Sequence, residues 1–118
     1  MRYAFFDTES SNNFNHISKM CEFGCVLADA DLNPIMSSSR DMLMNPGRDG
    51  KFALLNRKDG RDLVLAHPYE AYYASPIFPA YYDNIRFFLT QKDTMYFLWA
   101  GENDIKALHD QRKYIVSF

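Results

Sequence analysis

Two carboxylates come directly after a short apolar run near the N-terminus, and they constrain how this part of the chain folds. The run is Tyr3-Ala4-Phe5-Phe6, and Asp7 and Glu9 follow it with Thr8 between them. A run that is apolar at every position predicts a strand in the middle of a sheet, covered on both faces. Alternate side chains of a strand share a face, so Asp7 and Glu9 are expected roughly 7 Å apart at the rim of that sheet.

The repulsion between these two carboxylates favours a metal site. Two anions held together on one strand face repel each other and contribute no packing. A divalent cation reverses this balance, because Mg²⁺ is bound in proteins by one or two carboxylates together with waters and substrate phosphate oxygens. The polar segment 10–16 predicts a loop that leaves the site open to a ligand.

The composition predicts one globular domain without a membrane span. The 118 residues are 47% hydrophobic and 16% aromatic, which suits a packed core and argues against wholesale disorder. No apolar run approaches the length of a membrane-spanning helix, and the N-terminus carries charge too early for a signal peptide, so we expect a cytoplasmic protein. The net charge of −2 lacks the basic footprint of a nucleic-acid-binding protein, although bound metal ions would supply positive charge at the site.

A second strand is predicted over residues 20–28, and it contains both cysteines. Cys21 and Cys25 would lie about 13 Å apart on one strand face, which is too far for a disulfide or a shared metal ion. We therefore interpret the two thiols as small core residues. The expected faces are Cys21, Phe23, Cys25 and Leu27 on one side, and Met20, Glu22, Gly24 and Val26 on the other.

The remaining patterns predict an α/β fold with a mixed sheet. Turn residues over 29–34 separate the second strand from a third over 41–44, and such short connections favour an antiparallel meander. Ser75-Pro76 predicts a helix start, and the strand predicted over 94–99 follows this helix. The helix would form a crossover that sets this strand parallel to the first one. Its expected apolar stripe comprises Phe78, Tyr81, Ile85, Phe88 and Leu89.

The segment between the third strand and the helix is rich in basic and aromatic residues. Glycines and basic residues over 47–61 predict a solvated loop, with contact to a phosphate backbone as the alternative. The tyrosines that follow are expected in the core, with stacking on nucleic-acid bases as the alternative.

A third carboxylate follows the strand predicted over 94–99. Ile105 and Leu108, at helical spacing, predict a new helix with Asp104 in its first turn. A favourable interaction with the helix dipole explains such a carboxylate by itself. Parallel neighbouring strands also end at the same edge of a sheet, where open α/β sheets bind ligands, so the topology brings Asp104 toward the first two carboxylates.

Several of these segments together resemble a known family. Phe5-Phe6-Asp7-Thr8-Glu9, followed by Glu22-Phe23-Gly24, resembles the opening of the DnaQ-like, DEDD-type 3′-5′ exonucleases, which have an RNase H-like fold. Asn45-Pro46 falls where those proteins often have an Asn-Pro after the third strand. The segment 98–108 is similar to their second motif as it occurs in KapD-like and related exoribonucleases, with one extra alanine between its tryptophan and glycine.

The resemblance implies a 3′-5′ exonuclease that hydrolyses phosphodiester bonds of RNA or DNA by a two-metal mechanism. Asp7, Glu9 and Asp104 would be the catalytic metal ligands for two Mg²⁺ or Mn²⁺ ions. Thr8 and Phe14 would contact the terminal nucleotide of a single-stranded 3′ end. The third motif of the family, a histidine followed by a fourth acidic ligand, has no match here. Residues 1–118 are therefore expected to be the N-terminal part of a single exonuclease domain and inactive alone.

Two alternatives to the exonuclease hypothesis stay open at this point. One is a noncatalytic module on the same fold that binds nucleic acid or protein, and the other is a metal-dependent endonuclease. The apolar run over 114–118 predicts a strand that would invite pairing with another chain, and its position at the terminus predicts a truncated domain. The choice between RNA and DNA depends on pocket geometry around the 2′-OH.

Overall fold

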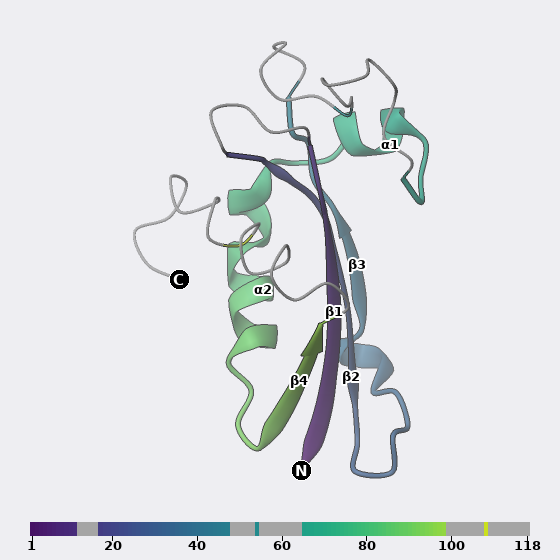
Figure 1. Cartoon of the computed structure of the whole chain (residues 1–118), viewed down its shortest axis with the longest axis vertical. Coiled ribbons are helices and arrows are strands. Elements are labelled where there is room, and N and C mark those ends of the chain that lie inside the picture. The colour runs from purple at the N-terminus through teal and green to yellow at the C-terminus, as the bar shows by residue number, and fades with distance from the viewer. Residues whose placement is uncertain (12–16, 48–53, 55–64, 99–107, 109–118) are drawn as a thin grey trace.

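Four strands form one mixed sheet in the computed structural model, which describes residues 1–11, 17–47, 54, 65–98 and 108 (Figure 1). Their order across the sheet is β3-β2-β1-β4, so the first strand is central, as its apolar run predicted. The strands are β1 (Arg2–Ser10), β2 (Met20–Ala28), β3 (Arg40–Leu43) and β4 (Thr94–Leu98). This part of the chain also forms the helices α1 (Tyr69–Tyr73) and α2 (Tyr82–Leu89), with 3-10 turns at Met36–Ser38 and Phe78–Tyr81.

The strands β1, β2 and β3 form the antiparallel meander that their short connections predicted. The observed β2 has the predicted bounds, and β3 begins and ends one residue before the predicted third strand. Asp29 closes the turn after β2, because its Oδ1 accepts hydrogen bonds from the backbone N–H groups of Asp31 and Asn33, each at 2.9 Å. The side chain of an aspartate commonly stabilises a turn in this way.

The strand β4 lies parallel to β1, with residue pairs that run from Arg2–Thr94 to Phe6–Leu98. Between β3 and β4 the chain passes along one side of the sheet through α2 (Figure 1). Parallel strands require such a crossover connection, so the parallel pairing depends on the helix between them. The predicted crossover helix and the predicted parallel pairing of the two strands are both confirmed.

Aromatic packing joins α2 to the sheet. The rings of Phe6 and Phe23 stack with centroids 5.4 Å apart, and Phe88 of α2 meets them edge-on at 6.0 and 5.9 Å. Offset and edge-on aromatic pairs add to the free energy gained by burial. The apolar stripe predicted for the helix is confirmed. Its buried members are Phe78, Ile85 and Phe88, and its other two members, Tyr81 and Leu89, are partly buried against the same cluster.

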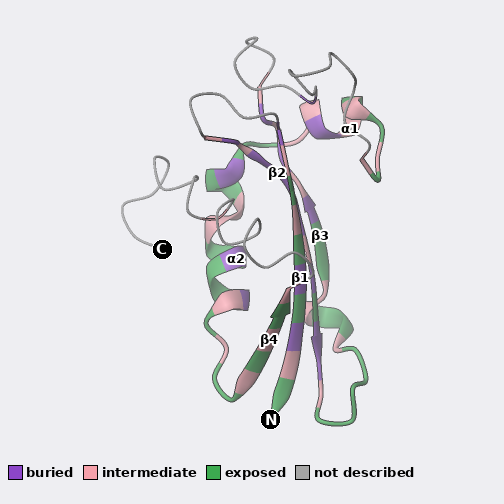
Figure 2. Cartoon of the chain, in the orientation of Figure 1, coloured by how far each residue is buried: buried purple, intermediate pink, exposed green. Residues whose placement is uncertain are grey.

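The opposite side of the sheet, which we call the open face, is more exposed, since buried and exposed residues alternate along β1 (Figure 2). Phe5 of β1 is 40% exposed there, and its ring stacks on that of Phe97 of β4 with centroids 5.2 Å apart. The prediction that the first strand is covered on both faces is therefore wrong at Phe5. The apolar run reflects aromatic contacts along the open face as well as burial against α2.

A β-bulge at the start of β2 changes the predicted faces of that strand. Glu9 pairs with Glu22, but the next pair joins Ser10 to Met20, so Cys21 is an extra residue between the pairs. Met20 therefore packs in the core cluster that includes α2. The assignment of Met20 and Cys21 to faces was wrong, because strict alternation does not anticipate an inserted residue.

The bulge also separates the environments of the two thiols. Cys21 packs with Leu54 and Tyr72 in a second buried cluster, whereas Cys25 lies in the main core. Both cysteines are free and buried, which confirms their interpretation as core residues. Burial raises the pKa of both thiols, so neither has the thiolate character of a reactive cysteine.

The crossover helix starts later than Ser75-Pro76 predicted. Ser75 Oγ donates a hydrogen bond to the carbonyl of Ala71 at 2.7 Å, at the C-terminal end of α1, a helix that the sequence did not predict. The helix α2 begins only at Tyr82, after a 3-10 turn. Pro79 explains the delay, because an α-helix that began at residue 76 would need a backbone N–H at residue 79, which proline lacks.

We expect Phe88→Ala to lower the free energy of unfolding by about 3–5 kcal/mol, as truncation of a buried aromatic residue does. Phe87→Ala is the matched control, because Phe87 is the preceding residue on α2 and is 65% exposed whereas Phe88 is 5% exposed. For the control we expect a change within roughly 0.5 kcal/mol. Urea-induced unfolding measures both values, and equal losses would contradict the observed packing.

Candidate functional site

Asp7 and Glu9 lie on the open face of β1, after the pairs that join this strand to β4 among the described residues. Those pairs run as far as Phe6 and Leu98, and β1 itself continues to Ser10. Both carboxylate residues are exposed, and they alternate with residues that face the core. Alternation in an extended strand therefore places them together on the open face.

Thr8 contributes its backbone to this pair. Its N–H donates a hydrogen bond to Asp7 Oδ1 at 3.0 Å, which orients the Asp7 carboxylate. The Thr8 side chain is half-buried and belongs to the opposite face, by the same alternation. Any contact of Thr8 with a ligand on the open face would therefore come from its backbone.

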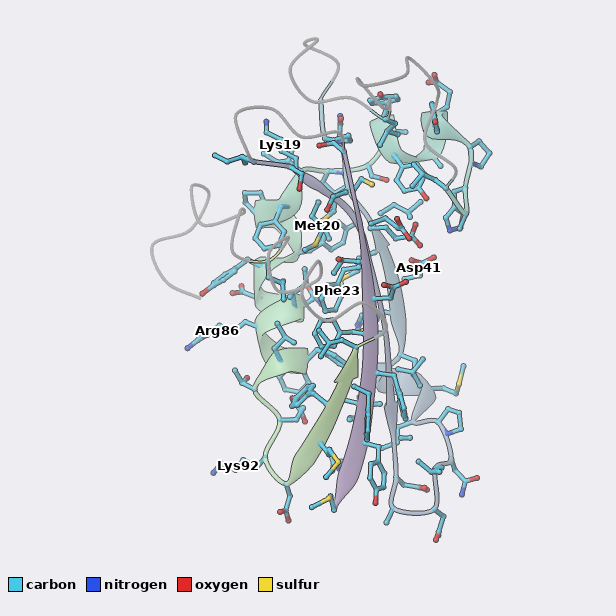
Figure 3. All side chains as sticks on the ribbon, viewed as in Figure 1. Lys19, Met20, Phe23, Asp41, Arg86 and Lys92 are labelled. Atoms are coloured by element: carbon cyan, nitrogen blue, oxygen red, sulfur yellow. The ribbon has the colours of Figure 1, made fainter. Side chains whose placement is uncertain are left out.

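Strand pairing brings two further carboxylates to the open face. Glu22 of β2 is paired with Glu9, and Gly24 is paired with Asp7 on one side and with Asp41 of β3 on the other. Directly paired residues share a face of the sheet. Figure 3 shows Asp41 on the side of the sheet away from α2. A Cβ at Gly24 would lie 4.0 Å from Asp41 Oδ1, so the glycine leaves open the space between the two aspartates.

Glu22 lies at the centre of a hydrogen-bonded group. The Tyr72 hydroxyl donates to Glu22 Oε1 at 2.7 Å, and both residues are buried. His67 Nε2 lies 3.0 Å from Asp41 Oδ2 and 3.8 Å from Glu22 Oε2. Burial is the largest cause that raises the pKa of Glu22, to about 7, and the hydrogen bond with Asp41 raises it further. The hydrogen bond from Tyr72 lowers this pKa but does not cancel the rise. The Glu22 carboxyl therefore titrates near neutral pH.

The turn after β3 fastens α1 beside this group. Asn45 Nδ2 donates to the Tyr73 carbonyl at 3.1 Å, and the Asn45 backbone N–H donates to the Pro76 carbonyl at 3.0 Å. Gly47 donates its N–H to Asn45 Oδ1 at 2.8 Å from a left-handed backbone conformation (φ 95°) that favours glycine. The Asn-Pro-Gly turn thus fixes the helix that presents Tyr72 to Glu22.

A shallow groove of about 330 Å³ runs beside Asp7 on the open face. On this face it is lined by Phe5, Asp7, Gly24, Val26 and Phe97. Apart from Asp7, these side chains are apolar or absent. The groove therefore combines aromatic side chains with a carboxylate, and a phosphate beside this carboxylate requires a cation between the two like charges.

Chemically, the carboxylates of the open face suit a hard divalent cation. Carboxylate oxygens are the ligands that Mg²⁺ and Mn²⁺ prefer in proteins, and exposed side chains leave room for water and substrate oxygens. Asp104 and Phe14, also expected at the site, lie outside the described residues. Tyr72, Asp41 and His67 were not predicted as neighbours of Glu22, since only the register and the position of α1 bring them together.

Comparisons of the chain with family profiles, with curated proteins and with solved structures returned no match. Among the residues that the structure describes, no helix has the length and apolar character needed to cross a membrane.

The raised pKa of Glu22 makes folding stability depend on pH. In the unfolded chain the carboxyl titrates near 4.5, so the folded state holds its proton more tightly. Stability from this group is present at low pH and is lost as pH rises through about 7. Glu22→Gln keeps an acceptor for Tyr72 and cannot ionise, so its stability relative to wild type should increase between about pH 5 and about pH 8.

Urea denaturation across this pH range measures the difference. Asp83→Asn, which changes an exposed carboxylate on α2, is the control and should keep the wild-type pH dependence. A Glu22→Gln variant with the same pH dependence as wild type would show that Glu22 ionises normally in the folded protein.

Proposed function

We propose that this chain is part of a metal-dependent 3′-5′ exonuclease with an RNase H-like fold, acting on a single-stranded 3′ end of RNA or DNA. The observation that supports it best is the position of Asp7 and Glu9. They lie on the open face directly after Phe6, which makes the last described pair between β1 and β4 with Leu98. Open α/β sheets bind their ligands at this edge.

The sheet supports the proposal through its topology. An antiparallel meander followed by a crossover to a strand parallel with the first is the arrangement expected from the resemblance. The order β3-β2-β1-β4 makes β1 central in the sheet. Asp7 and Glu9 themselves are paired with Gly24 and Glu22 of β2, which fixes their backbone positions on that side.

Asp7 and Glu9 are suited to hold Mg²⁺ or Mn²⁺ because both are exposed and offer only oxygen ligands. When bound, two such ions would activate water and stabilise the attacking and leaving oxygens of the phosphodiester. The Thr8 N–H donates a hydrogen bond to Asp7 Oδ1 and so orients this carboxylate. In this proposal Asp104 supplies the third carboxylate.

The aromatic surface next to Asp7 would hold the terminal nucleotide. Phe5 and Phe97 stack on each other and line the groove that has Asp7 at its edge. Stacking on an aromatic ring is tolerant of base identity and contributes roughly 1–3 kcal/mol per base. A nucleotide seated here would have its phosphate beside the carboxylates, and Phe14 is the proposed further stacking residue.

We expect Asp7→Asn, in the full-length protein encoded by the gene, to abolish Mn²⁺-dependent shortening of a 5′-labelled single strand while the fold survives. The amide has the shape of the carboxylate but lacks the charge that binds the cations. Asp31→Asn, in the exposed turn after β2, is the matched control and should degrade substrate as wild type does.

The products distinguish the exonuclease from its alternatives. A ladder shortened from the 3′ end with circular substrate intact supports the proposal, and cleavage of the circle indicates an endonuclease. Binding of the strand without any cleavage by wild type indicates a noncatalytic module. Equal activity of Asp7→Asn and wild type would contradict the assigned site.

A further inference from the structure

We infer that Glu22, Asp41 and His67 form a separate Zn²⁺-binding site on the open face, outside the ligand set proposed for catalysis. The three residues come from β2, β3 and the segment before α1, and one ligand atom from each lies within 4.8 Å of the others. This juxtaposition depends on the fold, because the residues are far apart in the sequence. A metal ion here would tie the segment before α1 to the sheet.

The donor set favours Zn²⁺ over Mg²⁺. Imidazole nitrogen is a good ligand for Zn²⁺, whereas Mg²⁺ prefers oxygen ligands alone. Tetrahedral zinc with bonds of about 2.0–2.2 Å places neighbouring ligand atoms about 3.4 Å apart. The distances from His67 Nε2 to Asp41 Oδ2 and Glu22 Oε2, 3.0 and 3.8 Å, lie on either side of that value. The partly exposed Asp41 side chain has room to adjust its position.

Tyr72 orients the Glu22 carboxylate, and ligands in metal centres are commonly oriented in this way. Its buried hydroxyl donates to Glu22 Oε1 at 2.7 Å, and the other oxygen, Oε2, is the one near His67. Outer hydrogen bonds of this kind hold ligating carboxylates in metal sites. Glu22 is only 9% exposed. Its second oxygen, Oε2, is therefore largely shielded from solvent beside His67.

The carboxylate oxygens of Glu22 and Asp41 in this cluster lie within 4.8 Å of each other. Within the described part of the chain, His67 is the one basic side chain within 4.0 Å of the two carboxylates. Arg40 precedes Asp41 on β3 but pairs with Cys25, which packs in the core cluster on the opposite side of the sheet. A divalent ion between the carboxylates would replace their repulsion with attraction.

The experiment titrates Zn²⁺ into the ¹⁵N-labelled chain and follows imidazole nitrogens by NMR, with affinity measured by calorimetry. The chain has three histidines, and ligation should shift the Nε2 resonance of His67 and leave the other two unchanged. Loss of a supporting hydrogen bond alone lowers metal affinity about 10–100-fold. We therefore expect His67→Ala and Asp41→Asn to raise the Kd at least about tenfold, and Tyr72→Phe to raise it about tenfold.

Two controls separate this site from others. Asp83→Asn changes an exposed carboxylate on α2 and should bind Zn²⁺ as wild type does. Asp7→Asn should also keep the His67 shift, which distinguishes this site from the proposed catalytic one. The inference is overturned if wild type shows no His67 shift with Zn²⁺, or if Asp41→Asn binds Zn²⁺ as tightly as wild type.

Discussion

The register between β1 and β2 is the constraint on which the rest of the structure depends. It pairs Asp7 with Gly24 and Glu9 with Glu22, and it sets Phe6 against Cys25 on the other face. A slip of one residue would move every side chain of a strand to the opposite face. The carboxylates would then enter the core and the Phe6 ring would face solvent. The β-bulge at Cys21 shifts the alternation of β2 by one residue. Met20, the first residue of the strand, therefore packs in the core.

The two faces of the sheet have opposite energetic roles. Burial of aromatic rings against α2 stabilises the sheet, and the same strands hold carboxylates close together on the open face. The structure reduces the resulting repulsion at Glu22, where the Tyr72 hydroxyl donates a hydrogen bond and His67 lies nearby. Asp7 and Glu9 lie exposed on the same face. A stable core thus maintains an arrangement of like charges that favours cation binding.

Patterns of neighbouring residues predicted those elements that depend only on neighbouring residues. The bounds of β2, the meander and the stripe of α2 follow from alternation, turn residues and helical spacing. The helix α1 escaped prediction because tertiary contacts hold it, namely the hydrogen bonds of Asn45 to Tyr73 and of Tyr72 to Glu22. The candidate site divides in the same way. Alternation places Asp7 and Glu9 together, but only strand register adds Asp41, and only the position of α1 adds Tyr72.

The central claim is that the open face binds divalent cations at the carboxylates of β1. Crystals of the chain grown with Mn²⁺ and measured near the manganese absorption edge test it most directly, because the anomalous signal locates the ion independently of any assumed chemistry. The account predicts an anomalous peak bound by Asp7 and Glu9 oxygens. An ordered β1 without a peak at these carboxylates, or with a peak only at the Glu22 cluster, would contradict it.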